Sequence, residues 1–240
     1  TIEENQYMKD FVKQMLKLGW PKAVICGIGG ACGCESNFKY WLVNEKEFNG
    51  NYSQSKANAT FQKPYIYGAG LIQWSLDRKK TLVENVTNES GVKLYQVHGS
   101  NSAEDFSISK VPSLMDRRTR IAKPNNLDGR ISFEWTGGIE NFTMAEQAMC
   151  IDYELTHNLK QVGNTLKQLT TNDYDTVDKA TYTVYTKYVA CCQNAPGVST
   201  KEDACSVSCK YSSQFGETTG IEKRVAYAEW MFANWDKISK

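Results

Sequence analysis

Two short stretches combine residue types that can act on a carbohydrate. The first, CESNF at 34–38, places Glu35 directly after a run rich in glycine and cysteine. The second, YGAGLIQW at 67–74, joins two glycines to Gln73 and Trp74. A carboxyl group can donate a proton to a leaving oxygen, an amide can hydrogen-bond an acetamido group, and an indole ring can lie flat against a sugar. This combination predicts acid catalysis on a glycan.

The carboxyl group of Glu35 is predicted to lie at the C-terminal end of a buried helix. The helix dipole and the apolar neighbours both disfavour a negative charge there, so we expect the pKa of this carboxyl to be raised. A raised pKa keeps the proton available at neutral pH, which a general acid requires. The neighbouring Ser36 is expected to support the loop, because no paired His and Asp is visible that would activate it as a nucleophile.

The elements that must position these stretches are mainly helical. Apolar residues recur at helical spacing in most of the chain, and they alternate as in a strand at Ile131, Phe133 and Trp135. Thr143–Glu146 and Thr219–Glu222 have the capping-box pattern that opens a helix. The expected helices cover about 3–18, 21–34, 75–88, 143–160, 164–169, 175–192 and 219–237.

These elements predict a mainly α fold (α+β). We expect one helical domain over residues 1–240, with a small irregular β or loop insertion at 90–142. The helices at both ends of the chain are expected to close one helical core around this insertion. The chain begins at Thr1 without a methionine or a signal peptide, and we expect it to be a fragment of a longer protein.

The second expected helix carries glycines that would weaken it in isolation. Each lowers helix propensity by up to about 1 kcal/mol relative to alanine. Such a helix must be held by burial, and its small residues let another backbone come close. We expect tight packing around Gly27, Gly29, Gly30 and Gly33.

The composition argues against several classes of partner. The net charge is +1, without the basic field that favours nucleic-acid binding. No apolar run approaches the roughly 18–20 residues that a membrane span needs. Hydrophobic residues make up 41% of the chain, which supports a sizeable core rather than disorder. No cofactor is expected.

The eight cysteines allow three interpretations, which are disulfides, free thiols and a zinc site. Disulfides are favoured, because they suit an exported protein of this size. The spacings Cys32-x-Cys34 and Cys205-x-x-x-Cys209 differ from the usual C-x-x-C pair of a zinc site, and the chain has two histidines. No metal site is therefore expected.

The two stretches together resemble the lysozyme superfamily, in the branch that goose-type lysozymes share with lytic transglycosylases. Glu-Ser followed about 30 residues later by Gly-Ala-Gly-Leu-Ile-Gln-Trp, with Arg78 shortly after, looks most like the phage tail lysozyme family. The run LGWPKAVICGIGGACGCESNF also resembles the helix that opens that family's domain. The resemblance is good over about 8–88, looser over 143–195, and absent over 90–142 and after about 197.

This resemblance implies a lysozyme-like fold and the cleavage of peptidoglycan between N-acetylmuramic acid and N-acetylglucosamine, with Glu35 as the acid that protonates the glycosidic oxygen. It also implies a phage tail or a conjugation machine as the setting, a virion or extracellular location, and other tail or secretion-machine proteins as partners. The residues that it implies in substrate binding are Ser36, Gly68, Gly70, Leu71, Gln73, Trp74 and Tyr188.

The identity of a second catalytic carboxylate stays open. Glycosidases usually pair an acid with a base or nucleophile. Glu45, Glu47 and Asp77 are the candidates, although each is interpreted first as a solvated surface charge. Relatives in this branch manage without a strict second carboxylate, and transglycosylases use groups of the substrate to form a 1,6-anhydro product. Hydrolysis and transglycosylation are therefore both possible outcomes.

The departures from the family pattern lead to further hypotheses. A disulfide from Cys26, Cys32 or Cys34, to Cys150 or to the 191–209 cluster, would brace the helix that carries the glutamate. The alternative to an enzyme is a non-catalytic glycan-binding or structural module of a tail or secretion apparatus, because a lysozyme-like fold can keep its cleft after losing activity. A cysteine-rich zinc protein is the third hypothesis.

Overall fold

The computed structural model describes residues 1–42, 68–74, 76–98, 139, 142–189 and 220–240. The chain divides into two compact units. Unit 1 consists of Thr1–Phe38 and Ile151–Lys240, and unit 2 consists of Lys39–Cys150. The expectation of one domain over residues 1–240 with an insertion stays a prediction, since most of residues 90–142 lie outside the described part.

The fold is mainly α, as the sequence predicted. In the described ranges, β pairing is limited to isolated bridges between Ala69 and Trp74 and between Thr87 and Lys93. The strand predicted at 131–135 lies outside these ranges. None of the helices that the structure describes is long and apolar enough to cross a membrane.

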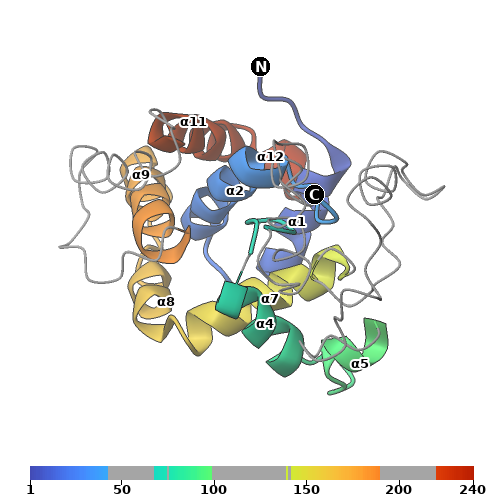
Figure 1. Ribbon diagram of the computed structural model, residues 1–240. Helices are drawn as coiled ribbons and strands as arrows, with labels where there is room; N and C mark the ends of the chain where they lie inside the picture. The colour runs from blue at the N-terminus through green and yellow to red at the C-terminus, as the bar shows by residue number, and fades with distance from the viewer. Residues whose placement is uncertain (43–67, 75, 99–138, 140–141, 190–219) are drawn as a thin grey trace, which may run out of the picture. The chain divides into compact units, whose positions relative to one another are not determined.

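Unit 1 is built from helices at both ends of the chain (Figure 1). They are α1 (Gln6–Lys17), α2 (Lys22–Ser36), the end of α7 (Met144–Thr156), α8 (Lys160–Lys167), α9 (Tyr174–Thr183), the π-helix η5 (Val184–Val189), α11 (Gly220–Ala233) and α12 (Trp235–Ile238).

Helix α1 follows the amphipathic pattern of its sequence. Its N-cap residue, Asn5, accepts a hydrogen bond from the backbone N–H of Met8 at 2.8 Å. The apolar residues Met8, Phe11, Val12 and Met15 are fully buried, as their helical spacing predicted, whereas Leu16 of the same predicted set is 40% exposed.

Helix α2 forms the centre of unit 1 and is buried at every residue from Ala23 to Gly33. It lies beside α9 and α11 (Figure 1). A Cβ at Gly27 would lie 2.9 Å from the backbone carbon of Ala180 in α9, and one at Gly30 would lie 2.5 Å from the carbonyl oxygen of Arg224 in α11. The predicted close approach of other backbones is confirmed, and the absence of side chains at these positions makes it possible.

Unit 2 contains α4 (Leu76–Asn85), α5 (Leu94–His98) and the first part of α7. The predicted capping box of α7 is confirmed. Thr143 accepts from the N–H of Glu146 at 3.2 Å, and the Glu146 carboxylate accepts from the N–H of Thr143 at 2.8 Å. The cap predicted at Thr219 lies outside the described residues.

Candidate active site

Glu35 lies in the last turn of α2, as the sequence predicted. The helix ends at Ser36, and Asn37 follows with a φ of 49° in the left-handed region. The N–H of Phe38 donates to the carbonyl of Cys32 at 3.3 Å, which closes the helix end. The Glu35 side chain is 24% exposed, so its carboxyl group is partly open to solvent although its helix is buried.

The residues after Glu35 keep this helix end in place. Phe38 also has a positive φ, 60°, which is unusual for a bulky side chain. Its ring is fully buried, with its centre 5.4 Å from that of Phe11 in α1. The hydroxyl of Ser36 is buried and donates to the carbonyl of Cys32 at 3.1 Å. These contacts offset the backbone strain and hold the last turn of α2 rigidly.

Arg224 of α11 contacts Glu35 directly. Its Nη2 donates a hydrogen bond to Oε1 of Glu35 within a salt bridge. Its Nη1 donates to the carbonyl of Gly220 at 2.8 Å, and its guanidinium carbon lies 4.2 Å from the centre of the Tyr185 ring. The Arg224 side chain is 6% exposed. These contacts fix the guanidinium group beside the glutamate.

The electrostatic environment of Glu35 therefore differs from the one inferred from its helix alone. A helix C-terminus and poor solvation disfavour the carboxylate, as the sequence indicated. A buried guanidinium in contact with it has the opposite effect, because an opposite charge favours the ionised form. Arg224 was missed because it lies 189 residues away in the sequence, and no local pattern connects the two positions.

Two cysteines of α2, the helix that carries Glu35, are packing residues. Cys26 and Cys32 are free and fully buried. Burial raises the pKa of the Cys26 thiol to about 12. Burial, together with the nearby negative charge of Glu35, raises the pKa of Cys32 well above its ordinary value. Both thiols stay protonated at neutral pH, which makes them poor nucleophiles and poor metal ligands.

The expected disulfide brace is not seen at Cys26 or Cys32. The 191–209 cysteines lie outside the described residues. In the ranges that the structure describes, no three His, Cys, Asp or Glu residues are grouped so that they could hold a metal ion.

The second motif, Gly68–Trp74, forms a tight turn in unit 2. Ala69 and Trp74 exchange backbone hydrogen bonds of 3.0 and 2.9 Å across it. Gly70 has a φ of 81°, which favours glycine, and a Cβ there would lie 2.7 Å from Oε1 of Gln147. The glycine therefore lets the turn come close to the Gln147 side chain.

Gln147 of α7 holds this turn in place. It is fully buried, and its Oε1 accepts a hydrogen bond from the N–H of Leu71 at 2.9 Å. Its Nε2 donates to the carbonyls of Tyr40 at 2.5 Å and Ile139 at 2.8 Å. Sequence reasoning missed Gln147. The one local feature that marks it is its position directly after the capping box of α7.

The other residues of the turn serve its internal structure. Gln73 has a φ of 56°, and its Nε2 donates to the carbonyls of Leu42 at 3.1 Å and Gly70 at 2.9 Å. Leu71 and Trp74 are buried. The predicted role of these side chains in binding a glycan stays a prediction, and the contacts observed are those that shape the turn.

Tyr188 lies in η5, within unit 1, and is fully buried. Its hydroxyl donates to a carboxylate oxygen of Glu154 at 2.8 Å, and Glu154 is 2% exposed. The role of Tyr188 in substrate binding stays a prediction. No pattern in the sequence pointed to Glu154, a buried carboxylate of unit 1.

The predicted site residues are thus distributed over both units. Glu35, Ser36 and Tyr188 belong to unit 1, whereas the Gly68–Trp74 turn belongs to unit 2. The candidates for a second carboxylate are not placed. Glu45 and Glu47 lie outside the described residues, and of Asp77 the structure describes its backbone position in α4.

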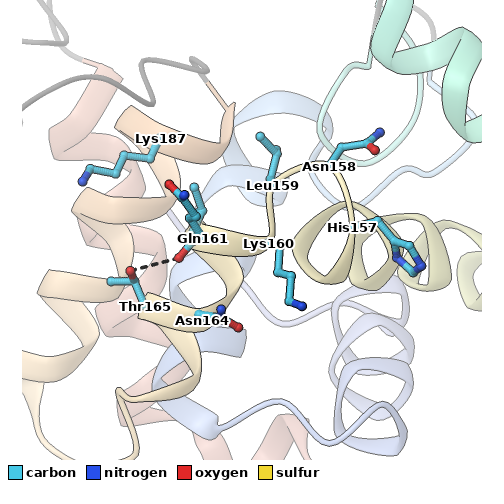
Figure 2. Close-up of a pocket in the computed structure, with 9 residues that line it drawn as sticks. His157, Asn158, Leu159, Lys160, Gln161, Asn164, Thr165 and Lys187 are labelled. Atoms are coloured by element: carbon cyan, nitrogen blue, oxygen red, sulfur yellow. Dashed lines mark hydrogen bonds between the residues drawn. The ribbon is translucent and has the colours of Figure 1, made fainter.

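A hollow of about 550 Å³ also lies in unit 1, around α8 (Figure 2). Its lining includes His157, Lys160, Gln161 and Lys187. Figure 2 shows Lys160 and Lys187 extending in different directions rather than converging on one point. Of the predicted site residues that the structure describes, none is in the lining of this hollow.

Comparison with known proteins finds no matching family model, no matching curated protein and no matching solved structure. The resemblance to the phage tail lysozyme family therefore depends on the sequence motifs, and it stays a prediction.

Proposed function

We propose that the protein is a peptidoglycan-degrading glycosidase that cleaves the β-1,4 bond between N-acetylmuramic acid and N-acetylglucosamine. Glu35 is its general acid. The observation that carries this proposal is the placement of Glu35, a partly exposed carboxyl group at the end of a buried helix. Ionisable groups held in such surroundings are more often functional than those on an open surface.

In the proposed reaction, protonated Glu35 donates its proton to the glycosidic oxygen as the bond to the anomeric carbon breaks. The sugar develops positive charge, and either water or a hydroxyl group of the substrate completes the reaction. Rigid placement matters, because a misplacement of about 1 Å can lower a rate on the order of 100-fold. The buried α2 and its closed end supply that rigidity.

We further propose bacterial peptidoglycan as the substrate, with the Gly68–Trp74 turn contributing to its binding. A phage tail or a conjugation machine is the proposed setting, on a virion or outside the cell. These proposals are supported by the sequence motifs.

The test is the variant Glu35→Gln, assayed on purified cell walls, with Glu3→Gln as a control because Glu3 is an exposed carboxylate outside the helices. We expect Glu35→Gln to lower the rate of wall clearing on the order of 100-fold or more, while the control retains the parent rate. Equal clearing by Glu35→Gln and the parent protein would refute the assignment. Mass spectrometry of the products separates a reducing muramic sugar from a 1,6-anhydro sugar.

A second candidate function is a non-catalytic glycan-binding module. The observation that favours it is the salt bridge with Arg224, because an ionised Glu35 has no proton to donate. This function predicts that the protein binds walls and releases no sugar, even at acidic pH. Sugar release at any pH, abolished in Glu35→Gln, would exclude it.

A further inference from the structure

The salt bridge between Glu35 and Arg224 is poorly built as a stabilising feature. Burying a guanidinium lowers stability unless its N–H groups are hydrogen-bonded. In a buried ion pair, the attraction between the charges often only balances the free energy lost by removing both from water. Nε of Arg224 is buried and has no hydrogen-bond partner in the described part of the chain. A buried donor without a hydrogen-bond partner lowers stability. The pair therefore calls for an explanation other than stability.

Two titratable side chains of α11 lie near the end of α2 that carries Glu35. From α11 come Arg224 and Tyr227, whose hydroxyl donates to the Asn37 side chain at 3.1 Å. Burial, together with the nearby Cys34, raises the pKa of Tyr227, so it is neutral at neutral pH.

Other neighbours of α2 at the contacts described are uncharged side chains. Tyr185 of η5 lies against the guanidinium of Arg224. A Cβ at Gly27 would meet Ala180 and Thr181 of α9, and one at Gly29 would lie 3.5 Å from the Phe11 ring of α1. On α2 itself, Cys32 stays protonated because its pKa is raised, and Cys34 is half-buried. Arg224 is a buried cation in direct contact with Glu35.

We propose that Arg224 is a positioning residue for Glu35, which orients its carboxyl group and sets the pH above which the acid form is lost. This inference rests on the proposed function, since it concerns the proton that Glu35 donates. The guanidinium stabilises the carboxylate, so the protonated acid accumulates only as the pH falls. Activity then rises toward acidic pH, and the alkaline limb of the pH–activity profile reports the protonation of Glu35.

The test compares pH–activity profiles of the parent protein with those of Arg224→Gln and Arg224→Lys. The control is Lys223→Gln, which removes a neighbouring exposed charge of the same helix. We expect Arg224→Gln to move the alkaline limb to higher pH, because the carboxylate loses its stabilising charge. Arg224→Lys should keep the limb near its parent position but lower kcat on the order of 10- to 100-fold with little change in KM, because an ammonium cannot reproduce the planar fork of a guanidinium.

An unmoved limb in a folded Arg224→Gln variant would overturn the proposal, as would an equal shift in Lys223→Gln. A loss of thermal stability alone, with parent kcat and pH profile, would indicate a structural role and also overturn it. Should Arg224→Gln fail to fold, the profile and kcat of Arg224→Lys decide the question by the same expectations.

A direct titration separates this inference from the proposed function. The carboxyl carbon of Glu35 can be followed by NMR in the free parent protein and in the Arg224 variants, without any substrate. We expect Glu35 to take up its proton at a lower pH in the parent than in Arg224→Gln. The same midpoint in both would refute the role of Arg224 even if Glu35→Gln proves that Glu35 is catalytic. A difference without any glycosidase activity would refute the proposed function instead.

Discussion

Gly30 of α2 lies against the backbone carbonyl of Arg224 in α11. A Cβ at Gly30 would come to 2.5 Å from that oxygen, a distance that real Cβ atoms do not show. The absence of a side chain at Gly30 thus decides how close α11 comes to α2. Because the Arg224 side chain starts from that same point of α11, helix packing and the position of the guanidinium beside Glu35 are linked.

We therefore predict that Gly30→Ala destabilises the protein by about 1–3 kcal/mol, the usual cost of overfilling a packed interior. The backbone of α11 would have to move away from α2, since a carbonyl cannot rotate aside as a flexible side chain can. Urea unfolding followed by circular dichroism measures the change. The same shift should move Arg224 and lower wall-clearing activity.

The adjacent Gly29 provides a matched control. A Cβ at Gly29 would meet the flexible end of the Met231 side chain rather than backbone. Gly29→Ala should be close to neutral, because Met231 can adopt another rotamer and alanine improves helix propensity by up to about 1 kcal/mol. Equal destabilisation by the two substitutions would contradict the importance of the Gly30 contact.

A second prediction concerns Gln147, whose amide holds the Gly68–Trp74 turn. Gln147→Leu keeps the volume but leaves the N–H of Leu71 and the carbonyl of Ile139 without this partner. Each unsatisfied buried group costs about 1–3 kcal/mol, so we expect a loss of stability of roughly 2–4 kcal/mol. Gln168→Leu, at an exposed position, should change stability little.

Hydrogen exchange makes the prediction for Gln147 specific to the turn. The amide of Leu71 should lose protection in Gln147→Leu relative to amides of α2, because the turn opens before the rest of the chain unfolds. Uniform loss of protection throughout the protein would mean that Gln147 stabilises the whole fold rather than this turn.

Local patterns made several elements predictable from the sequence. The spacing of Met8, Phe11 and Met15 gave the buried face of α1, and the reciprocal hydrogen bonds of Thr143 and Glu146 follow from their residue types and separation. The glycines of α2 indicated close packing, because a helix with so many glycines has a low helix propensity and must be stabilised by burial. In each case the information lies within one helix.

Features that depend on tertiary contacts were not predictable in this way. The sequence suggested a helix over about 175–192, but it did not show that α9 continues as the π-helix η5 from Val184. Likewise, the pairing of Arg224 with Glu35 and of Tyr188 with Glu154 joins residues far apart in the sequence. A single arginine or tyrosine has no local signature that names its partner.

A third prediction concerns the N-cap of α9. The carboxylate of Asp173 accepts a hydrogen bond from the N–H of Thr176 at 2.8 Å, and this bond lowers the pKa of Asp173 below its ordinary value of 3.8. A lowered folded-state pKa means that the carboxylate contributes stability above that ordinary value and loses it as the pH falls below it. Asp173→Ala should therefore lower Tm at pH 7, and the difference from the parent protein should shrink in acid.

Asp173→Asn serves as the comparison for this cap. Asparagine accepts the same hydrogen bond without titrating, so we expect its Tm difference from the parent to be smaller than that of alanine at pH 7. Differential scanning calorimetry between pH 7 and pH 3 measures both variants. A Tm difference for Asp173→Ala that stays constant over this range would show that the charge of Asp173 plays no part.

The last prediction distinguishes the observed contact of Tyr188 from the role that the resemblance implies. Tyr188→Phe removes the donor to the buried carboxylate of Glu154, and we expect a loss of about 1–3 kcal/mol in the free energy of unfolding with KM for cell walls unchanged. Tyr174→Phe, on the exposed side of α9, should leave both quantities unchanged. A raised KM with parent stability would instead mean that the Tyr188 hydroxyl reaches the glycan, and that the pair with Glu154 opens when substrate binds.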